Sequence, residues 1–152
     1  MEPGSSSPFG GGVFVEDRRW RFYVRDVPGV VARALAVAGC EADVVLTDDR
    51  TVRRLNGRDR GKNKPTNVLT YEHPPEIILA LGVVRREAVR ERKSVAAHLT
   101  HLLIHGALHL QGFDHHHPGE AREMESEETK LLARLRVANP WKTRIIVEMK
   151  SL

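Results

Sequence analysis

Cysteine, long apolar runs and a secretory leader are scarce or missing in this chain. Its only cysteine is Cys40, so no internal disulfide can form and a free thiol in a reducing compartment is expected. No apolar run reaches the roughly 18 residues that a transmembrane helix needs. Residues 1–12 are rich in Gly, Ser and Pro and lack an apolar segment, which predicts a flexible leader and no signal peptide. These absences make the cytoplasm the expected compartment.

The length and composition fit one globular domain. The chain has 152 residues, of which 41% are hydrophobic and 29% are charged, enough for one sizeable core. The formal net charge is +4. Basic residues gather in residues 18–25 and 53–64, whereas residues 119–128 are acidic, and this segregation supports a surface that contacts phosphates. We assign residues 13–138 to one folded domain and residues 139–152 to a C-terminal tail.

Hydrophobic periodicity and capping residues predict an α+β fold. Strands are predicted over apolar or β-branched stretches, at residues 20–24, 42–47, 66–71 and 76–81. Helices are predicted over amphipathic stretches, at residues 28–39, about 48–58, 83–92, 94–111 and 119–137. Residues 143–149 fit a short strand and an ordered tail equally well. Because the strands come early and the helices mostly late, we expect a single α+β domain with a small mixed β-sheet and several helices.

The stretch "HLLIHGALHLQGFDHHH", residues 101–117, holds six of the eight histidines. Residues four apart on an α-helix share one face, about 6 Å apart along the axis. His105 and His109 could therefore share one metal ion at about 2.0–2.1 Å per nitrogen. Gly112 can adopt a left-handed conformation and end the helix, which would turn the chain back and bring His115 to the ion. Three neutral imidazoles leave one tetrahedral position open, as in catalytic zinc sites.

Residues around this predicted site allow more than one interpretation. The helical histidines could instead form a polar seam on a half-buried helix. His101 either supports a ligand from behind or packs on the helix, and Asp114 either orients a ligand imidazole or caps the turn. His116 and His117 are expected to be exposed, although either could replace the third ligand. Gly106 allows close backbone approach and stands where an HExxH peptidase has its general-base glutamate, which argues against proteolysis.

Two motifs carry a resemblance to a known family. The segment "HGALHLQGFDH", residues 105–115, resembles the H-G-x-L-H-L-x-G-[YF]-D-H signature of the YbeY family, bacterial rRNA maturation factors and single-strand-specific endoribonucleases. The segment "LNGRDRGKNKPTNVLTY", residues 55–71, is similar to the family's L-N-x-x-x-R…P-T-[DN]-V-L-S-F stretch. The similarity spans about residues 42–136. The chain departs from the family at "HPPEIILAL", which replaces a Gly-Asp-Ile-type turn, and at Thr70 and Tyr71, which replace Ser and Phe.

The resemblance implies that residues 13–138 are a catalytic metal-binding domain with a zincin-like central metal-binding helix. The implied activity is that of a metal-dependent endoribonuclease in rRNA processing, including 16S 3′-end maturation, and in ribosome quality control. It implies rRNA on the 30S or 70S ribosome as the partner, with ribosomal proteins and a ribosome-assembly GTPase as further candidates, and neither DNA nor a membrane. One Zn²⁺ per chain is expected on His105, His109 and His115, although imidazoles also suit Ni²⁺, Cu²⁺ and iron. Two other functions stay open: a ribosome-biogenesis binding factor with a structural metal, and a metal hydrolase of another substrate.

Arg60 is the candidate catalytic residue, by the resemblance and by its chemistry. A guanidinium stays protonated and offers paired donors to the charge that develops on phosphoryl oxygens, and the spacing of "RGKNKPTNVL" favours Arg60 over Arg58. Lys62 and Lys64 would either contact flanking phosphates or be solvated. Asn67 would either hold its loop or hydrogen-bond substrate. A bound metal would activate a water and polarise a phosphoryl oxygen, while the choice between water and the ribose 2′-hydroxyl as nucleophile stays open and no general base is evident.

Overall fold

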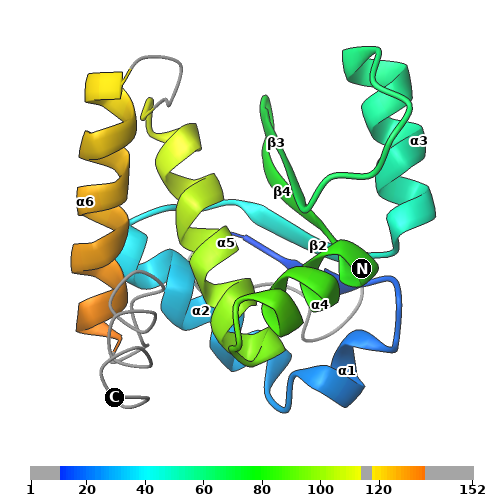
Figure 1. Cartoon of the computed structure of the whole chain (residues 1–152), viewed down its shortest axis with the longest axis horizontal. Helices are drawn as coiled ribbons and strands as arrows, with labels where there is room; N and C mark the ends of the chain where they lie inside the picture. Colours follow the sequence, from blue (N-terminus) through cyan, green and yellow to red (C-terminus); the bar gives the residue numbers. More distant parts are fainter. Residues whose placement is uncertain (1–10, 114–117, 136–152) are drawn as a thin grey trace.

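A computed structural model describes residues 11–113 and 118–135, which fold around one four-stranded sheet (Figure 1). The strands are β1 (Val13–Val15), β2 (Asp43–Thr47), β3 (Val68–Glu72) and β4 (Pro75–Ala80). The helices are α1 (Trp20–Tyr23), α2 (Val27–Ala38), α3 (Asp49–Arg60), α4 (Leu81–Arg90), α5 (Val95–Leu110) and α6 (Pro118–Arg134). The predicted α+β architecture with a small mixed sheet is confirmed.

The sheet has the order β1-β2-β4-β3 and mixes parallel with antiparallel pairing. β1 pairs in parallel with β2 and β2 pairs in parallel with β4, whereas β3 runs antiparallel to β4 at one edge. Ile77, Ile78, Leu79 and Ala80 of β4 are each at most 4% exposed, as expected for an interior strand covered on both faces. Thr70 of β3 lies opposite Ile77 of β4 in the register, and this pair forms the part of the sheet next to the candidate site.

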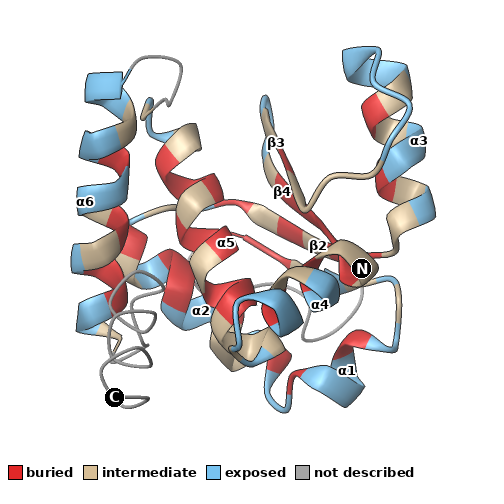
Figure 2. Cartoon of the chain, in the orientation of Figure 1, coloured by how far each residue is buried: buried red, intermediate tan, exposed pale blue. Residues whose placement is uncertain are grey.

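Helices cover both faces of the sheet (Figure 2). On one face α2 and α5 form the larger core with Ile77 and Leu79 of β4, and α6 packs against both helices. On the other face Val52 of α3 packs with Ile78 and Ala80 of β4. Alternate strand residues point to opposite faces, so β4 contributes to both cores. α5 is the central helix, since it contacts the sheet and also α2, α4 and α6.

Several helices begin and end at the residues that the sequence predicts. The side chains of Asp26, Asp48 and Ser94 accept backbone hydrogen bonds in the first turns of α2, α3 and α5, which satisfies N–H groups that have no partner inside the helix. Gly39 ends α2 in the left-handed region with φ of 64°. The predicted start of the central helix at Ser94 is therefore confirmed, and this start sets which residues of α5 face the sheet.

The strand predicted at residues 20–24 is wrong, because this segment contains the short helix α1. Asp17 Oδ1 accepts a 3.0 Å hydrogen bond from the backbone N–H of Arg19, which turns the chain directly after β1. Trp20 is fully buried and its Nε1 donates to the carbonyl of Thr47 at 2.9 Å. The alternation of apolar and polar residues in "WRFYV" therefore reflects the burial of Trp20 and not a strand. The edge strand of the sheet is instead β1, whose three residues are too few for a periodic pattern.

Some predicted segments lie outside the described residues. These are most of the leader at 1–12, the tail at 139–152 with its segment 143–149, and the turn that carries His115. Gly12, at the end of the predicted leader, is buried, and its backbone N–H donates to Asp43 Oδ1 at 2.8 Å. Within the described parts of the chain, no helix has the length and apolar character needed to cross a membrane.

Candidate metal centre

α5 packs tightly against the sheet at Gly106. A Cβ atom added to Gly106 would lie 3.2 Å from Cγ2 of both Ile77 and Thr70, so a larger residue would displace the helix or the strands. The predicted close backbone approach at Gly106 is therefore made to the sheet. Position 106 points at β3 and β4, so a glutamate placed there could not act as the general base that HExxH peptidases use.

His105 and His109 converge through their Nε2 atoms, which are 3.1 Å apart. Their ring centroids are 4.7 Å apart and the rings meet edge to face at 79°. Two nitrogens bound to one tetrahedral ion at about 2.0–2.1 Å are themselves roughly 3.3 Å apart. The separation of the two Nε2 atoms therefore fits two ligands of one metal ion.

The end of α5 has the geometry that the predicted turn requires, up to Phe113. The helix ends at Leu110, and Gly112 has φ of 100°, a region that favours glycine. The described residues do not include the next four positions, Asp114, His115, His116 and His117. Within residues 11–113 and 118–135, no three His, Cys, Asp or Glu side chains form a group that could hold a metal ion. The three-histidine site therefore depends on His115 and stays a prediction.

Glu128 of α6 is a site residue that was not predicted from the sequence. Its Oε1 lies 2.5 Å from Nδ1 of His105 and its Oε2 lies 3.0 Å from Nε2 of His101. Burial raises the pKa of this 5% exposed carboxyl, but hydrogen bonds from the two histidines outweigh burial and hold the pKa at about 2. An ionised carboxylate only accepts hydrogen bonds, so Nδ1 of His105 donates to Glu128, and Nε2, which faces His109, is the ring nitrogen placed to bind a metal ion. Carboxylates support metal-binding histidines in this way.

The sequence does contain a signal for Glu128. On α6 the buried residues are Met124, Glu128, Leu131 and Leu132, spaced at four, three and one residues along the chain. Glu128 therefore interrupts the apolar stripe of an amphipathic helix. A carboxylate in such a stripe needs a buried partner. The helix α5 carries the histidines and packs against α6, so it can supply that partner.

His101 lies behind the histidine pair, on the far side of Glu128. Its Nε2 bonds to the carboxylate oxygen that His105 does not use, and its side chain is 14% exposed. The structure thus places His101 where it can support a ligand through Glu128, in line with the first of its two predicted roles.

Arg60 lies at the C-terminal end of α3, beside β3. Its Nη2 donates to the carbonyl of Thr70 at 2.6 Å, and its guanidinium lies 5.4 Å from the centroid of the Tyr71 ring. Thr70 is also the residue whose methyl group faces Gly106, so Arg60 is tied to the strand that α5 packs against. Arg58 instead forms two hydrogen bonds with Asp59, at 2.7 and 2.9 Å. The geometry therefore favours Arg60 over Arg58 as the arginine bound to the strand that α5 packs against.

The three predicted substrate-binding residues occupy different environments. Lys62 and Lys64 are exposed on the loop after α3, where they suit contacts to flanking phosphates or simple solvation. Asn67 is half-buried: its Nδ2 donates to Glu87 at 3.1 Å, and its Oδ1 accepts from the N–H of Val68 at 2.7 Å. These bonds connect the loop before β3 to Glu87 on α4, and a hydrogen bond from Asn67 to substrate stays a prediction.

A cavity of about 690 Å³ opens beside His105, between α4, α5 and α6. It is lined by four carboxylates, three histidines, one arginine, one amide and three apolar side chains, namely Glu87, Glu91, Glu125, Glu128, His98, His101, His105, Arg90, Asn67, Leu102, Ala121 and Met124. The candidate centre thus has an acid-lined cavity beside His105, whereas the exposed Lys62 and Lys64 lie on the loop between α3 and β3.

The described site is a carboxylate-supported histidine pair on the central helix of an α+β fold, an arrangement typical of metal-binding proteins. Comparisons with known proteins define the family. Residues 14–136 match the family model described as Endoribonuclease YbeY. The Endoribonuclease YbeY of Gluconobacter oxydans is 46% identical in an alignment of 157 positions that covers 93% of each chain. That of Chelativorans sp. is 42% identical in an alignment of 133 positions that covers 74% of this chain and 82% of the relative. The chain therefore belongs to the YbeY endoribonuclease family.

The fold has a solved counterpart. The solution structure of TM1509 from Thermotoga maritima superimposes with a TM-score of 0.54 at 19% identity, covering 82% of this chain and 91% of that chain. At this identity the likeness concerns the fold alone. It confirms that the helices and the mixed sheet are assembled as in a known structure.

Proposed function

We propose that this protein is a metal-dependent endoribonuclease that cleaves single-stranded rRNA, in 16S 3′-end maturation and in ribosome quality control. The observation that carries the proposal is the 3.1 Å approach of the Nε2 atoms of His105 and His109, with Nδ1 of His105 held by Glu128. Membership of a family of endoribonucleases supports RNA as the substrate. The exposed basic loop leads into β3, the strand that α5 contacts, and supports contacts to phosphates.

The site residues have different roles in the proposed reaction. His105, His109 and His115 would hold a Zn²⁺ ion, which when bound supplies a Lewis acid and an activated water. Glu128 keeps the Nδ1 proton of His105 in place and so keeps its Nε2 available as a ligand atom. Arg60 uses one of its N–H donors on Thr70, and its guanidinium would stabilise the negative charge that develops on the phosphoryl oxygens.

One experiment tests the proposal directly. The purified protein is analysed for bound metal and incubated with single-stranded rRNA, with and without a chelator. We expect about one Zn²⁺ per chain, cleavage that the chelator stops and that added Zn²⁺ restores, and loss of metal in His109→Ala. A protein that binds rRNA in a salt-dependent way but never cuts it, with or without Zn²⁺, would instead be a binding factor with a structural metal.

The ribosome is the proposed place of action. We propose rRNA within the 30S or 70S particle as the substrate, with ribosomal proteins and a ribosome-assembly GTPase as partners. Co-sedimentation of the His109→Ala protein with ribosomal particles tests this, because an uncleaved substrate should retain the protein. If the protein stays in the supernatant at low salt, a ribosomal substrate is excluded.

A further inference from the structure

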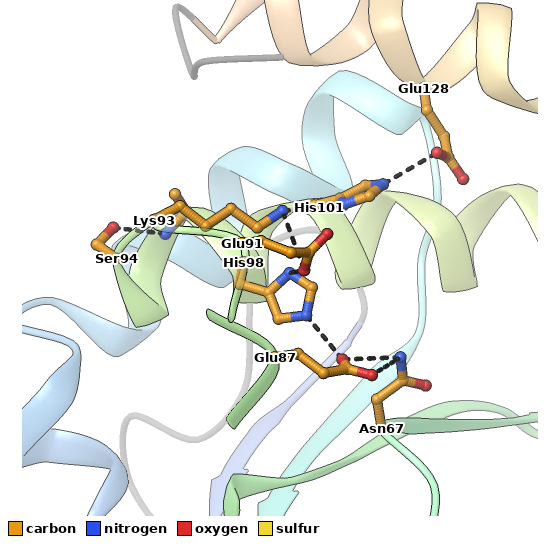
Figure 3. Close-up of polar contacts among 9 residues, drawn as sticks. Asn67, Glu87, Glu91, Lys93, Ser94, His98, His101 and Glu128 are labelled. Atoms are coloured by element: carbon orange, nitrogen blue, oxygen red, sulfur yellow. Dashed lines mark hydrogen bonds and ion pairs between the residues drawn. The ribbon is translucent and has the colours of Figure 1, made fainter. Parts of the chain in front are cut away.

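Hydrogen bonds continue behind Glu128, away from the candidate metal centre (Figure 3). His101 Nε2 bonds to Glu128 Oε2 at 3.0 Å, and His101 Nδ1 lies 3.4 Å from the Nζ atom of Lys93. Lys93 belongs to the turn between α4 and α5, directly before the N-cap of α5. One series of polar contacts thus leads from this turn to the candidate metal centre, through Lys93, His101, Glu128 and His105.

Donors and acceptors in this series point in a single direction. The Lys93 ammonium can only donate, and the Glu128 carboxylate can only accept. His101 lies between them, so it accepts at Nδ1 and donates at Nε2. The opposite tautomer would set an N–H of His101 against the ammonium and a bare nitrogen against the carboxylate. The neighbours of His101 therefore select one of its two neutral tautomers.

Lys93 is held in place by its surroundings. Its side chain is only 10% exposed, and its Nζ lies 4.0 Å from Glu91 Oε2. Burial lowers the pKa of Lys93, while the negative charges of Glu91, Glu87 and Glu128 oppose that effect. An ammonium among carboxylates that is mostly withdrawn from solvent has few alternative partners, so its donation to His101 is well defined.

We propose that Lys93 is a positioning residue for the metal centre: by donating to Nδ1 of His101 it fixes the Nε2–H tautomer of His101 and so holds Glu128 against His105. This inference rests on the proposed metal function for its effect on metal binding. Its effect on His101 is a property of the protein alone and can be measured without metal or RNA.

The test compares Lys93→Met, which keeps the length of the side chain but has no donor, with Lys93→Arg, which keeps a donor. Lys130→Met is the matched control, because Lys130 lies on α6 with 64% of its side chain exposed. Nitrogen chemical shifts of the His101 ring in the metal-free protein report its tautomer, and competition with a chromophoric chelator reports Zn²⁺ affinity. In Lys93→Met only Glu128 still favours the Nε2–H tautomer, so we expect a measurable fraction of the Nδ1–H tautomer and a Zn²⁺ affinity lowered about 10-fold. Lys93→Arg and Lys130→Met should resemble wild type.

The tautomer and affinity measurements decide between the proposal and its alternatives. If His101 in Lys93→Met keeps the Nε2–H tautomer alone, or if the Zn²⁺ affinity stays within twofold of Lys130→Met, the proposal is overturned. If Lys93→Met does not fold, Lys93→Gln is measured in its place and the same limits apply. A wild-type protein that binds no Zn²⁺ would refute the proposed function and the effect on metal binding, and the tautomer data would still decide whether Lys93 sets the state of His101.

Discussion

The carboxylate of Glu128 on α6 lies 2.5 Å from Nδ1 of His105 on α5, and this contact joins the C-terminal helix to the histidine pair. Glu128→Gln keeps the size of the side chain but removes its charge. We predict a 10- to 100-fold loss of Zn²⁺ affinity, the usual effect of removing a partner behind a metal ligand. Competition with a chelator measures the affinity. Glu127→Gln is the control, since its contact with Lys130 is a 3.9 Å surface ion pair. Equal affinities in the two variants would contradict a supporting role for Glu128.

Arg60 should matter for cleavage and not for metal binding. Arg60→Ala removes the guanidinium beside β3, and we predict a loss of about 10²–10³ in kcat, as for other single donors to a developing oxyanion. Arg60→Lys should restore only part of the rate, because lysine lacks paired donors. Zn²⁺ content should stay at the wild-type level in both variants. Arg58→Ala is the control, since Arg58 is paired with Asp59, and full activity of Arg60→Ala would remove Arg60 from the mechanism.

The histidine pair could be predicted from sequence because it is a local feature. His105 and His109 are one helical repeat apart, and helix geometry alone brings their side chains together. The contact between Glu128 and His105 joins residues 23 positions apart. It depends on how α6 packs on α5, which no periodic pattern encodes. The position of Arg60 likewise depends on β3, whose carbonyl at Thr70 receives its hydrogen bond.

The same distinction separates the predicted elements from the missed ones. Long amphipathic helices such as α2 and α5 carry their caps and apolar faces in the sequence, so they were predicted nearly to the residue. α1 has four residues, too few for a helical pattern, and its helical state follows from the burial of Trp20 under a tertiary hydrogen bond to Thr47. Tertiary contacts override local propensity in such short segments.

Two helical glycines should respond in opposite ways to alanine. Gly106→Ala places a methyl group 3.2 Å from Ile77 and Thr70, and we predict a loss of about 1–3 kcal/mol in the free energy of unfolding from overpacking. Gly57 lies inside α3, where an added Cβ meets nothing closer than 3.9 Å. Gly57→Ala should therefore raise the free energy of unfolding by about 0.5–1 kcal/mol. Urea unfolding measures both changes. A Gly106→Ala protein as stable as wild type would show that helix and sheet can separate without cost.

Glu87 on α4 should contribute stability that depends on pH. It accepts hydrogen bonds from His98 at 2.8 Å and from Asn67 at 3.1 Å. Burial raises the pKa of Glu87, but these bonds and the charges of His98 and Arg90 outweigh burial, so the pKa falls below its ordinary 4.5. A carboxyl with a lowered folded-state pKa stabilises the protein above its unfolded-state pKa, and that contribution is lost as the pH falls through the folded-state pKa.

Glu87→Gln should therefore reduce the free energy of unfolding at pH 7, by about 1–3 kcal/mol for bonds to a charged group. The difference from wild type should shrink as the pH falls below 4.5, the ordinary pKa of the side chain, because wild-type Glu87 then becomes neutral as well. Urea unfolding of both proteins at a series of pH values gives this difference, and titrating groups that do not interact with Glu87 cancel because both proteins contain them. Glu123→Gln, at an exposed position of α6, should show little difference at any pH. A difference for Glu87→Gln that stays constant from pH 7 to pH 3 would show that its carboxylate charge does not stabilise the link between α4, α5 and β3.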